Sequence, residues 1–362
     1  MFSSASSSMF RVCAAALGRV AVRLPSGAEA LVEATGPTGA ATLRVESAGA
    51  APVVVRSSWD EFGSVVRADD GGLEVVSPQR TSLTLAAGGD VAIVGKVEGD
   101  DVRAAARGRL SVGTARGARV ALAAGAGLDA SRLVEGVDVD VDVDGAVAIA
   151  KLQATRAAVA ARGGAAQIAA AYCADLSVSS DAADAGAVTL DTAHGRVAAA
   201  APNGGVVLRR CSGAAVVTCG GDADLAFDAV NGDVAAISAR GDVAVSVATD
   251  VAADVALSAP RVDASGAENF EAAGAEPGAL RGALVAVAKP LSRKGAGKVD
   301  AAGAATQRWD SAVTTDARRP TIAATAAGCA SLRTLSWIDS IRRQVGLPEG
   351  FEQKTRRARG RS

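Results

Sequence analysis

Residues 231–247 read NGDVAAISARGDVAVSV, in which two short runs of apolar residues each follow a glycine. Val243, Val245 and Val247 alternate with smaller side chains. A period of two predicts a β-strand with one buried and one solvated face. Glycine adopts positive φ without steric cost, and Asn and Asp tolerate turn geometry. The stretch therefore predicts short strands joined by turns, with Gly232 at a positive φ.

The same pattern recurs between Asp69 and Pro260. Four further examples are GGDVAIVG (88–95), RGRLSVG (107–113), RGARVALAAG (116–125) and HGRVAAAA (194–201). Successive turn glycines are mostly about 8–12 residues apart, the spacing of an all-β array. The chain is therefore predicted to be all-β, with many short strands in series.

Alanine is abundant and is the best helix former, so a helical alternative has to be weighed. The run GVDVDVDVDG (136–145) alternates strictly, which fits a strand and not a helix. Each internal glycine would also cost a helix roughly 1 kcal/mol relative to alanine. Both observations favour strands.

The apolar composition restricts the kind of β architecture. Apolar residues make up 49% of the 362 residues, but only 3% are aromatic. Two sheets of a sandwich need bulky side chains to fill a gap of about 10 Å. Ala and Val suit instead the narrow interior of a solenoid whose coils stack about 4.8 Å apart. We therefore predict a parallel β-solenoid (β-helix) of short, Gly-punctuated coils over residues 29–290.

The N-terminal segment has the composition of a targeting peptide. Residues 1–28 contain Arg11, Arg19 and Arg23, several serines and no acidic residue. That composition is typical of an organelle transit peptide. Import into the mitochondrion is the resulting expectation, with a plastid or cytoplasmic location as the alternative.

The C-terminal part changes character. Residues 291–330 contain Gly, Ala, Lys and few long apolar runs, and are predicted to be loop-rich. In 331–346 apolar residues recur at three- or four-residue spacing, which predicts an amphipathic helix that caps the last coil. Those residues are Leu332, Leu335, Ile338, Ile341 and Val345. Residues 347–362 are predicted to be a basic, disordered tail, and contact of 331–362 with a membrane surface is an alternative.

The charge and the cysteine content of the chain argue against several classes of protein. The net charge of −1 does not suit a globally basic nucleic-acid binder. No uncharged apolar run reaches the ~18 residues that a transmembrane helix needs. The five cysteines form no C-x-x-C pair, so neither a disulfide framework nor a zinc site is predicted. No cofactor or metal is expected.

Four segments resemble the adhesin domain family, and in particular its eukaryotic members. They are VEGDDVRA (97–104), IAKLQAT (149–155), AYCADLSVSSDAADAGAVTLDTAHGRV (171–197) and VNGDVAAISARGDVAVSV (230–247), with a matching Ser336-Trp337 near the C-terminus. The resemblance covers roughly residues 60–320. It implies a stacked β fold, without catalytic or binding residues to carry over.

The acidic run from Asp138 to Asp144 imitates the start of a calcium loop. With Asp140 as position 1, position 12 is Lys151, where a calcium loop requires glutamate. A solvated strand face is the favoured interpretation, with Arg119 or Arg156 of a neighbouring coil as partner.

Other motifs have equally plain explanations. RVALAAGAGLDA (119–130) imitates a dinucleotide-binding fingerprint, but only a very short segment is left for the helix that would hold the pyrophosphate. KGAGKVD (294–300) lacks the other residues of a P-loop. Arg240-Gly241-Asp242 spells an integrin-binding tripeptide but repeats the turn pattern of the chain.

His194 is the single histidine, so any Ser-His-Asp or Cys-His chemistry has to use it, with Asp191 or Cys211 as conceivable partners. It precedes a glycine in a predicted turn, and a turn residue is the favoured interpretation. Cys173, Cys211 and Cys219 are expected to be small apolar fillers of the core.

These observations favour a non-enzymatic interaction or scaffold protein that presents an extended solenoid face to a protein partner. The alternative is a carbohydrate-active β-helix enzyme that uses the Asp138–Asp144 face. A third hypothesis is cofactor binding through Gly125–Ala130. The sequence assigns no catalytic residue and leaves the binding residues open.

Overall fold

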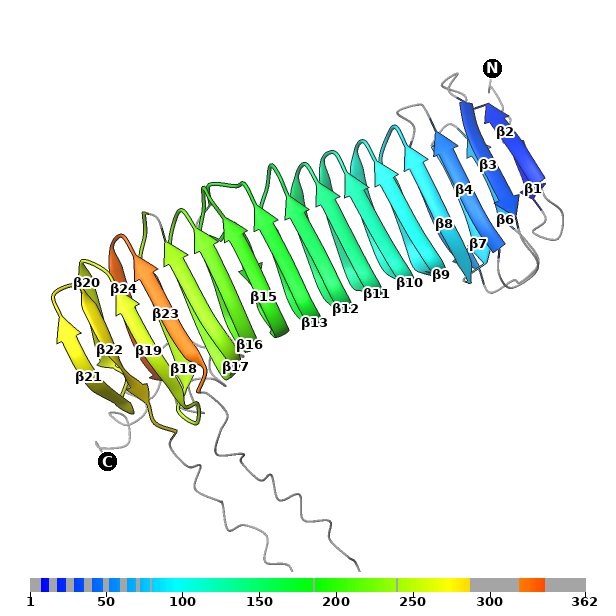
Figure 1. Ribbon diagram of the computed structural model, residues 1–362. Helices are drawn as coiled ribbons and strands as arrows, with labels where there is room; N and C mark the ends of the chain where they lie inside the picture. Colours follow the sequence, from blue (N-terminus) through cyan, green and yellow to red (C-terminus); the bar gives the residue numbers. More distant parts are fainter. Residues whose placement is uncertain are drawn as a thin grey trace, which may run out of the picture.

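The computed structural model describes residues 8–12, 18–23, 29–35, 41–47, 52–58, 64–69, 72–78, 80–184, 186–238, 240–286 and 319–335. Over these residues the chain forms 24 β-strands and no helix. The strands stack side by side into an elongated body, with the N-terminus at one end and the last strands at the other (Figure 1).

The strands vary greatly in length. The first eight are β1 (Ser8–Val12), β2 (Gly18–Arg23), β3 (Glu29–Thr35), β4 (Ala41–Ser47), β5 (Val53–Ser58), β6 (Ser64–Asp69), β7 (Gly72–Pro78) and β8 (Thr81–Ala87). The central ones are β9 (Val91–Ala106), β10 (Arg109–Ala124), β11 (Gly127–Val143), β12 (Ala146–Ala161), β13 (Ala166–Ser180), β14 (Val188–Leu190), β15 (Ala193–Ala201), β16 (Val206–Cys219) and β17 (Ala223–Ser238). The last are β18 (Val243–Ala248), β19 (Ala253–Ser258), β20 (Arg261–Gly266), β21 (Phe270–Glu276), β22 (Ala279–Leu284), β23 (Thr321–Ala326) and β24 (Cys329–Leu335).

Each long central strand is one coil of a parallel solenoid. β10 pairs in parallel with β9 on one side and β11 on the other, and β12 and β13 continue the series. Leu110 of β10 lies beside Leu128 of β11, one coil further along the chain. The strand bends in its middle, so each coil has a first arm and a second arm, which lie in opposite layers (Figure 1). The predicted parallel solenoid is confirmed.

The bend between the two arms is a corner that favours glycine. Gly99, Gly117 and Gly136 occupy it in successive coils and lie in register. A Cβ atom on Gly117 would lie 2.6 Å from the carbonyl oxygen of Gly99, closer than real Cβ contacts allow. Glycines therefore occur both at the corner and at the turn between coils. The predicted interval of about 8–12 residues corresponds to one arm, and a whole coil takes two such intervals.

Positive φ angles occur at five glycines of the described residues: Gly95, Gly127, Gly195, Gly213 and Gly278. Gly232 is not among them, so its predicted positive φ is wrong. Gly232 is instead restricted by the neighbouring coil, because a Cβ there would lie 3.0 Å from Cβ of Ala214.

The core lies between the two layers and is thin. In β12 the burial alternates along each arm, with Val147 and Ile149 buried in the first arm and Ala157 and Val159 in the second. The largest fully buried side chains are Phe227 and a set of Leu and Ile residues. Stacks of branched aliphatic side chains therefore hold the coils together, as the low aromatic content predicts.

Antiparallel strands complete both ends of the body. At the N-terminal end β2, β3 and β4 pair antiparallel in series, as do β1, β6 and β7. At the other end β22 joins antiparallel to both β19 and β21. β1 and β2 lie within the segment that the sequence predicts to be a transit peptide.

The C-terminal strands correct two predictions. β23 pairs in parallel with β17 and β19, and β24 pairs in parallel with β18 and β20 (Figure 1). Part of the segment predicted to be loop-rich is therefore strand. The helix predicted to start at residue 331 is wrong for residues 331–335, because Leu332 is fully buried in β24 beside Val245. The rest of that helix and the tail, 336–362, lie outside the described residues.

Within the described residues there is no helix long and apolar enough to cross a membrane.

Candidate functional site

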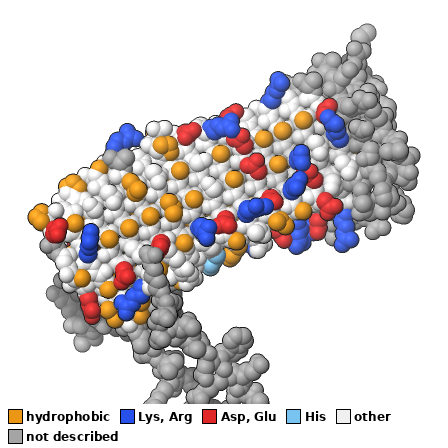
Figure 2. Space-filling view, viewed as in Figure 1, with side chains coloured by type: hydrophobic (Ala, Val, Ile, Leu, Met, Phe, Trp, Pro, Cys, Tyr) orange, Lys and Arg blue, Asp and Glu red, His pale blue; other side chains and the backbone are white. Residues whose placement is uncertain are grey.

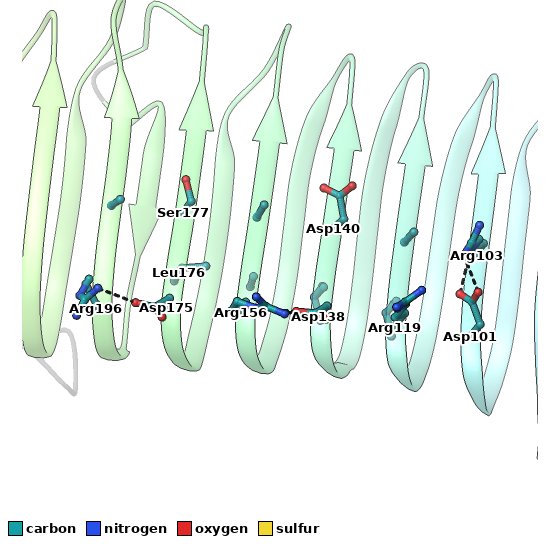
Figure 3. A pocket seen from close by; sticks show the side chains of 16 residues that line it. Asp101, Arg103, Arg119, Asp138, Asp140, Arg156, Asp175, Leu176, Ser177 and Arg196 are labelled. Atoms are coloured by element: carbon teal, nitrogen blue, oxygen red, sulfur yellow. Dashed lines mark hydrogen bonds and ion pairs between the residues drawn. The ribbon is translucent and has the colours of Figure 1, made fainter.

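The second arms of six successive coils bring charged residues into a single row. We call this the charge row: Asp101, Arg119, Asp138, Arg156, Asp175 and Arg196. Each member lies just after the corner of its coil and directly beside the corresponding residue of the next coil (Figure 3). The sign of the charge alternates at every step. Neighbouring members are on strands about 4.8 Å apart, so each of the four inner members has an opposite charge on both sides and each end member has one on one side.

Within the charge row the side chains pair in part. The Arg156 guanidinium donates to Oδ1 of Asp138 at 2.7 Å, and Nη1 of Arg196 lies 3.3 Å from Oδ1 of Asp175. These side chains stay open to solvent: Arg156 is 68% exposed and Asp138 is 41% exposed. Exposed pairs of this kind contribute about 0–1 kcal/mol each. Arg119 has no hydrogen bond or ion pair with any described residue.

Asp101 pairs along its own strand. The guanidinium of Arg103, two residues later, lies 2.7 Å from Oδ2 of Asp101 and points along the face (Figure 3). The hydrogen bond from Arg103, together with the carboxylate charge, raises the pKa of the Arg103 guanidinium. Arg103 thus adds a positive charge beside Asp101, at the end of the charge row.

A hollow of about 530 Å³ lies along the charge row. Its floor is formed by the next outward position of each coil. Short side chains occupy this position in four coils, and Arg103 and Asp140 occupy it in the other two; the short ones are Ala121, Ala158, Ser177 and Ala198. We call this surface, made of the charge row and its floor, the front face. Charged side chains lie in a line among apolar ones across the face shown in Figure 2. Val216, which lies in register with Ala198 on the next coil, is more than half exposed.

The aspartates of the acidic run in β11 alternate with buried valines and point outward, as the sequence predicts. Arg156 is the partner of Asp138, which confirms one of the two expected partners. Arg119 lies in register with Asp138 but does not pair with it. Arg162 of the next coil pairs with Asp142 at 2.5 Å and with Asp144 at 3.5 Å.

Asp140 is the member of this run that makes no hydrogen bond or ion pair with a described residue. In the described part of the chain no group of three His, Cys, Asp or Glu side chains is arranged to hold a metal ion. The carboxylates of β11 are directed outward from a flat sheet, and most of them face arginine.

A second charged cluster lies at the corners of the first coils. Arg116 lies 2.9 Å from Glu135 and 3.8 Å from Glu98, each on an adjacent coil. The hydrogen bond from Lys96 and the nearby positive charges lower the pKa of Glu98, against a smaller opposing effect of burial. A hollow of about 580 Å³ adjoins this cluster.

His194 lies at a corner, directly beside Tyr172 of the previous coil. The two rings are stacked, with centroids 5.0 Å apart, and Nζ of Lys151 lies 5.4 Å from the Tyr172 ring. Of the two conceivable catalytic partners, Asp191 pairs with Arg209 at 2.7 Å and Cys211 is buried in the core. The structure brings neither of them into contact with His194. This fits the prediction that His194 is a turn residue without a catalytic role.

Three cysteines are core fillers, as predicted. Cys173, Cys211 and Cys219 are free and buried. Burial raises the pKa of the Cys173 thiol to about 11 and that of Cys211 to about 12. Burial also raises the pKa of Cys219. Thiols of this kind are protonated at neutral pH and are weak nucleophiles.

The remaining motifs do not form sites. β11 begins at Gly127, so the segment that imitates a dinucleotide fingerprint runs from a turn into a strand and has no helix N-terminus for a phosphate. Asp242 of the Arg-Gly-Asp turn accepts a hydrogen bond from the backbone N–H of Cys329 at 2.6 Å. The segment 294–300, which the sequence does not support as a P-loop, lies outside the described residues.

The charge row was not recognised from the sequence, although the sequence contains a signal for it. Its members follow one another at intervals of 18, 19, 18, 19 and 21 residues, and the acid or base alternates at each interval. A search for charge alternation at the length of a coil would find it.

Comparison of the chain with known protein families, curated proteins and solved structures finds no match. The resemblance to the adhesin domain family stays a prediction.

Proposed function

We propose that the protein is a non-enzymatic interaction protein whose front face binds a protein partner. The observation that supports this most is the combination of an exposed charge row with a floor of alanine and serine side chains. Short side chains leave the surface of the sheet accessible to a partner. The charge row can orient that partner and select it by its charges. The same proposal includes the resemblance to the adhesin domain family, whose stacked β fold suits an extended binding face.

The carbohydrate-active alternative has weaker support. Glycosidases need two carboxyl groups flanking the bond, one of them kept protonated by its surroundings. Asp138, Asp142 and Asp144 are instead engaged in ion pairs with arginine. Asp140 alone of this run is left for such a role, and the exposed Tyr172 lies at a corner, away from the floor of the front face.

Site-specific crosslinking in cells tests the proposal. A photo-crosslinking residue at Ala158 lies on the front face, whereas one at Ala148 lies on the opposite layer of the same strand and is also exposed. We expect a discrete protein adduct from position 158 and none from position 148. Equal labelling from both positions, or none from 158, would contradict the proposal. Cleavage of a polysaccharide by the purified protein that Asp140→Asn abolishes would favour the enzyme instead.

We also propose that the protein is imported into the mitochondrion, on the basis of the basic, acid-free leader. A fluorescent reporter fused to residues 1–30 is expected to enter mitochondria, and a diffuse cytosolic signal would contradict this. Contact of the C-terminal segment with a membrane surface is a weaker proposal, because Leu332 is buried inside the solenoid.

A further inference from the structure

The charge row is complementary in charge to a second copy of itself that runs in the opposite direction. A random pattern of ion pairs lacks this property. From Asp101 to Arg196 its signs run negative, positive, negative, positive, negative, positive. Because the row has an even number of alternating members, reading it backwards inverts every sign. A second copy of the same surface can therefore face it in the opposite direction with opposite charges throughout.

We propose that the partner of the front face is a second copy of this chain, docked front face to front face with the two solenoid axes antiparallel. The proposal rests on the proposed function and names its partner. The two-fold axis runs along the strand direction, between the strands of Asp138 and Arg156. It places Asp138 opposite Arg156 of the second copy, and Arg119 opposite the second copy's Asp175. A two-fold axis uses one surface twice, as most homodimers do.

The opposite orientation is disfavoured by the same charges. If the two axes were parallel and in register, each Asp would face Asp and each Arg would face Arg. Like charges facing each other across an interface weaken it and suppress that arrangement. Of the possible arrangements, only the antiparallel dimer in this register places all six members opposite a charge of the other sign.

The floor of the front face leaves room for the second copy. Ala121, Ala158 and Ala198 lie beside the charge row and reach no further than Cβ, and the hollow above them measures about 530 Å³. Two sheets pack face to face about 10 Å apart, a gap that alanine alone does not fill. The arginine side chains of the second copy, which lie opposite the charge row, are long enough to extend along the strands into this space. Arg119, which has no partner among the described residues, gains one.

The size of the front face fits a weak dimer. Six strands about 4.8 Å apart, each about 20 Å long on this face, cover roughly 600 Å² per copy. The total of roughly 1,200 Å² is at the lower end of specific interfaces. We therefore expect a reversible dimer with a dissociation constant in the micromolar range, weakened by salt because its contacts are exposed charges.

Asp140 is the unfavourable feature of this arrangement. The two-fold axis places it opposite Ala158 of the second copy, one strand away from the second copy's own Asp140. Two like charges without partners at this distance repel each other. Asp140→Asn is therefore expected to tighten the dimer about twofold to fivefold, although it removes a charge from the surface.

The decisive experiment uses two charge reversals in the full chain, Asp138→Arg and Arg156→Asp, each followed by sedimentation velocity over a concentration series. Alone, each reversal puts like charges opposite each other at two places and is expected to raise the dissociation constant at least tenfold. In an equimolar mixture of the two variants, every facing pair is again opposite in sign. The mixed dimer is expected to form within about threefold of the wild-type affinity.

This rescue separates the dimer from contacts within one chain, because Asp138 and Arg156 also pair intramolecularly and mixing cannot repair that pair. Should a reversal disturb folding, Arg119→Gln serves instead, since this exposed side chain forms no hydrogen bond or ion pair with a described residue. It is expected to weaken the dimer about threefold or more without changing the unfolding midpoint. A mixture no tighter than the single variants, or an unchanged dimer in Arg119→Gln, would overturn the proposal.

The two proposals fail in different ways. A wild-type chain that stays monomeric at about 100 μM in low salt, while position 158 still crosslinks to another protein in cells, refutes the dimer and leaves the proposed function standing. A wild-type chain that stays monomeric without any adduct from position 158 refutes both.

Discussion

Gly195→Ala is expected to be among the most damaging single-methyl changes in the protein. Gly195 lies at the corner of β15, just after His194, with φ of +103°. A Cβ atom there would lie 1.8 Å from the carbonyl oxygen of Cys173 on the previous coil and 3.0 Å from its carbonyl carbon. Both obstacles are backbone atoms, which cannot move aside as a side chain can.

The magnitude follows from these two costs. A non-glycine residue held at an unfavourable positive φ costs about 1–3 kcal/mol. The overlap with Cys173 adds to this, because β13 and β15 have to separate locally and lose ladder hydrogen bonds worth about 1 kcal/mol each. We therefore expect Gly195→Ala to lower the free energy of unfolding by at least about 3 kcal/mol. Total stabilities are typically about 5–15 kcal/mol, so the loss is large.

Gly274→Ala is the matched control. Gly274 is also a strand glycine, but a Cβ there meets nothing within 4 Å and its φ is not positive. Its effect is expected to stay within about 1 kcal/mol in either direction, since alanine also reduces the entropy of the unfolded chain.

Urea unfolding of the full chain, followed by far-UV circular dichroism, measures both variants. Hydrogen exchange adds a local readout, in which protection should fall in β13, β15 and β16 first. A Gly195→Ala variant that loses less than 1 kcal/mol, or one indistinguishable from Gly274→Ala, would refute the idea that close stacking at the corner requires glycine.

Two further predictions follow from the buried side chains. Leu332→Ala is expected to lower the free energy of unfolding by about 2–5 kcal/mol because the side chain is fully buried in β24, whereas Leu335→Ala at the end of the strand should cost much less; equal effects in urea titrations would contradict this. The pKa of the Cys211 thiol is raised from 9.0 to about 12 by burial, so between these values the thiol ionises in the unfolded chain but not in the folded one. The stability that this thiol contributes is therefore fully present below about pH 9 and falls as the pH rises, by about 1.4 kcal/mol at pH 10. Cys211→Ala should reduce the difference between the urea midpoints at pH 8 and pH 10, and an unchanged difference would contradict the prediction.

The solenoid could be predicted because its requirements are local. Alternation along each arm and glycine at each change of direction are both visible within ten residues of sequence. The coil length could not be predicted in the same way. The corner at Gly117 and the turn at Gly108 carry the same residue type, although the first joins two arms of one coil and the second joins two coils. Only the register between coils distinguishes them.

The C-terminal strands could not be predicted because their partners are far away in the sequence. Leu332 and Leu335 are three residues apart, a spacing that predicts a helix, because in a strand it places the two side chains on opposite faces. In the structure β24 lies between β18 and β20 and obtains hydrogen bonds from both, with Val245 beside Leu332. A strand that completes two neighbouring strands satisfies more backbone groups than an isolated helix of the same residues would. Local periodicity carries no information about such partners.

The acidic run of β11 shows how stacking changes the meaning of a motif. Read along the chain, Asp138 has Asp140 as its nearest charge, about 6.6 Å away along the strand, and the run suggests a cation site. Across the coils, Arg119 and Arg156 lie on strands only about 4.8 Å away, and Arg156 forms an ion pair with Asp138. Attraction at the shorter distance exceeds repulsion at the longer one. The carboxylate of Asp138 thus belongs to a row that runs across the strands, and the residues 18 or 19 positions away decide what this surface can bind.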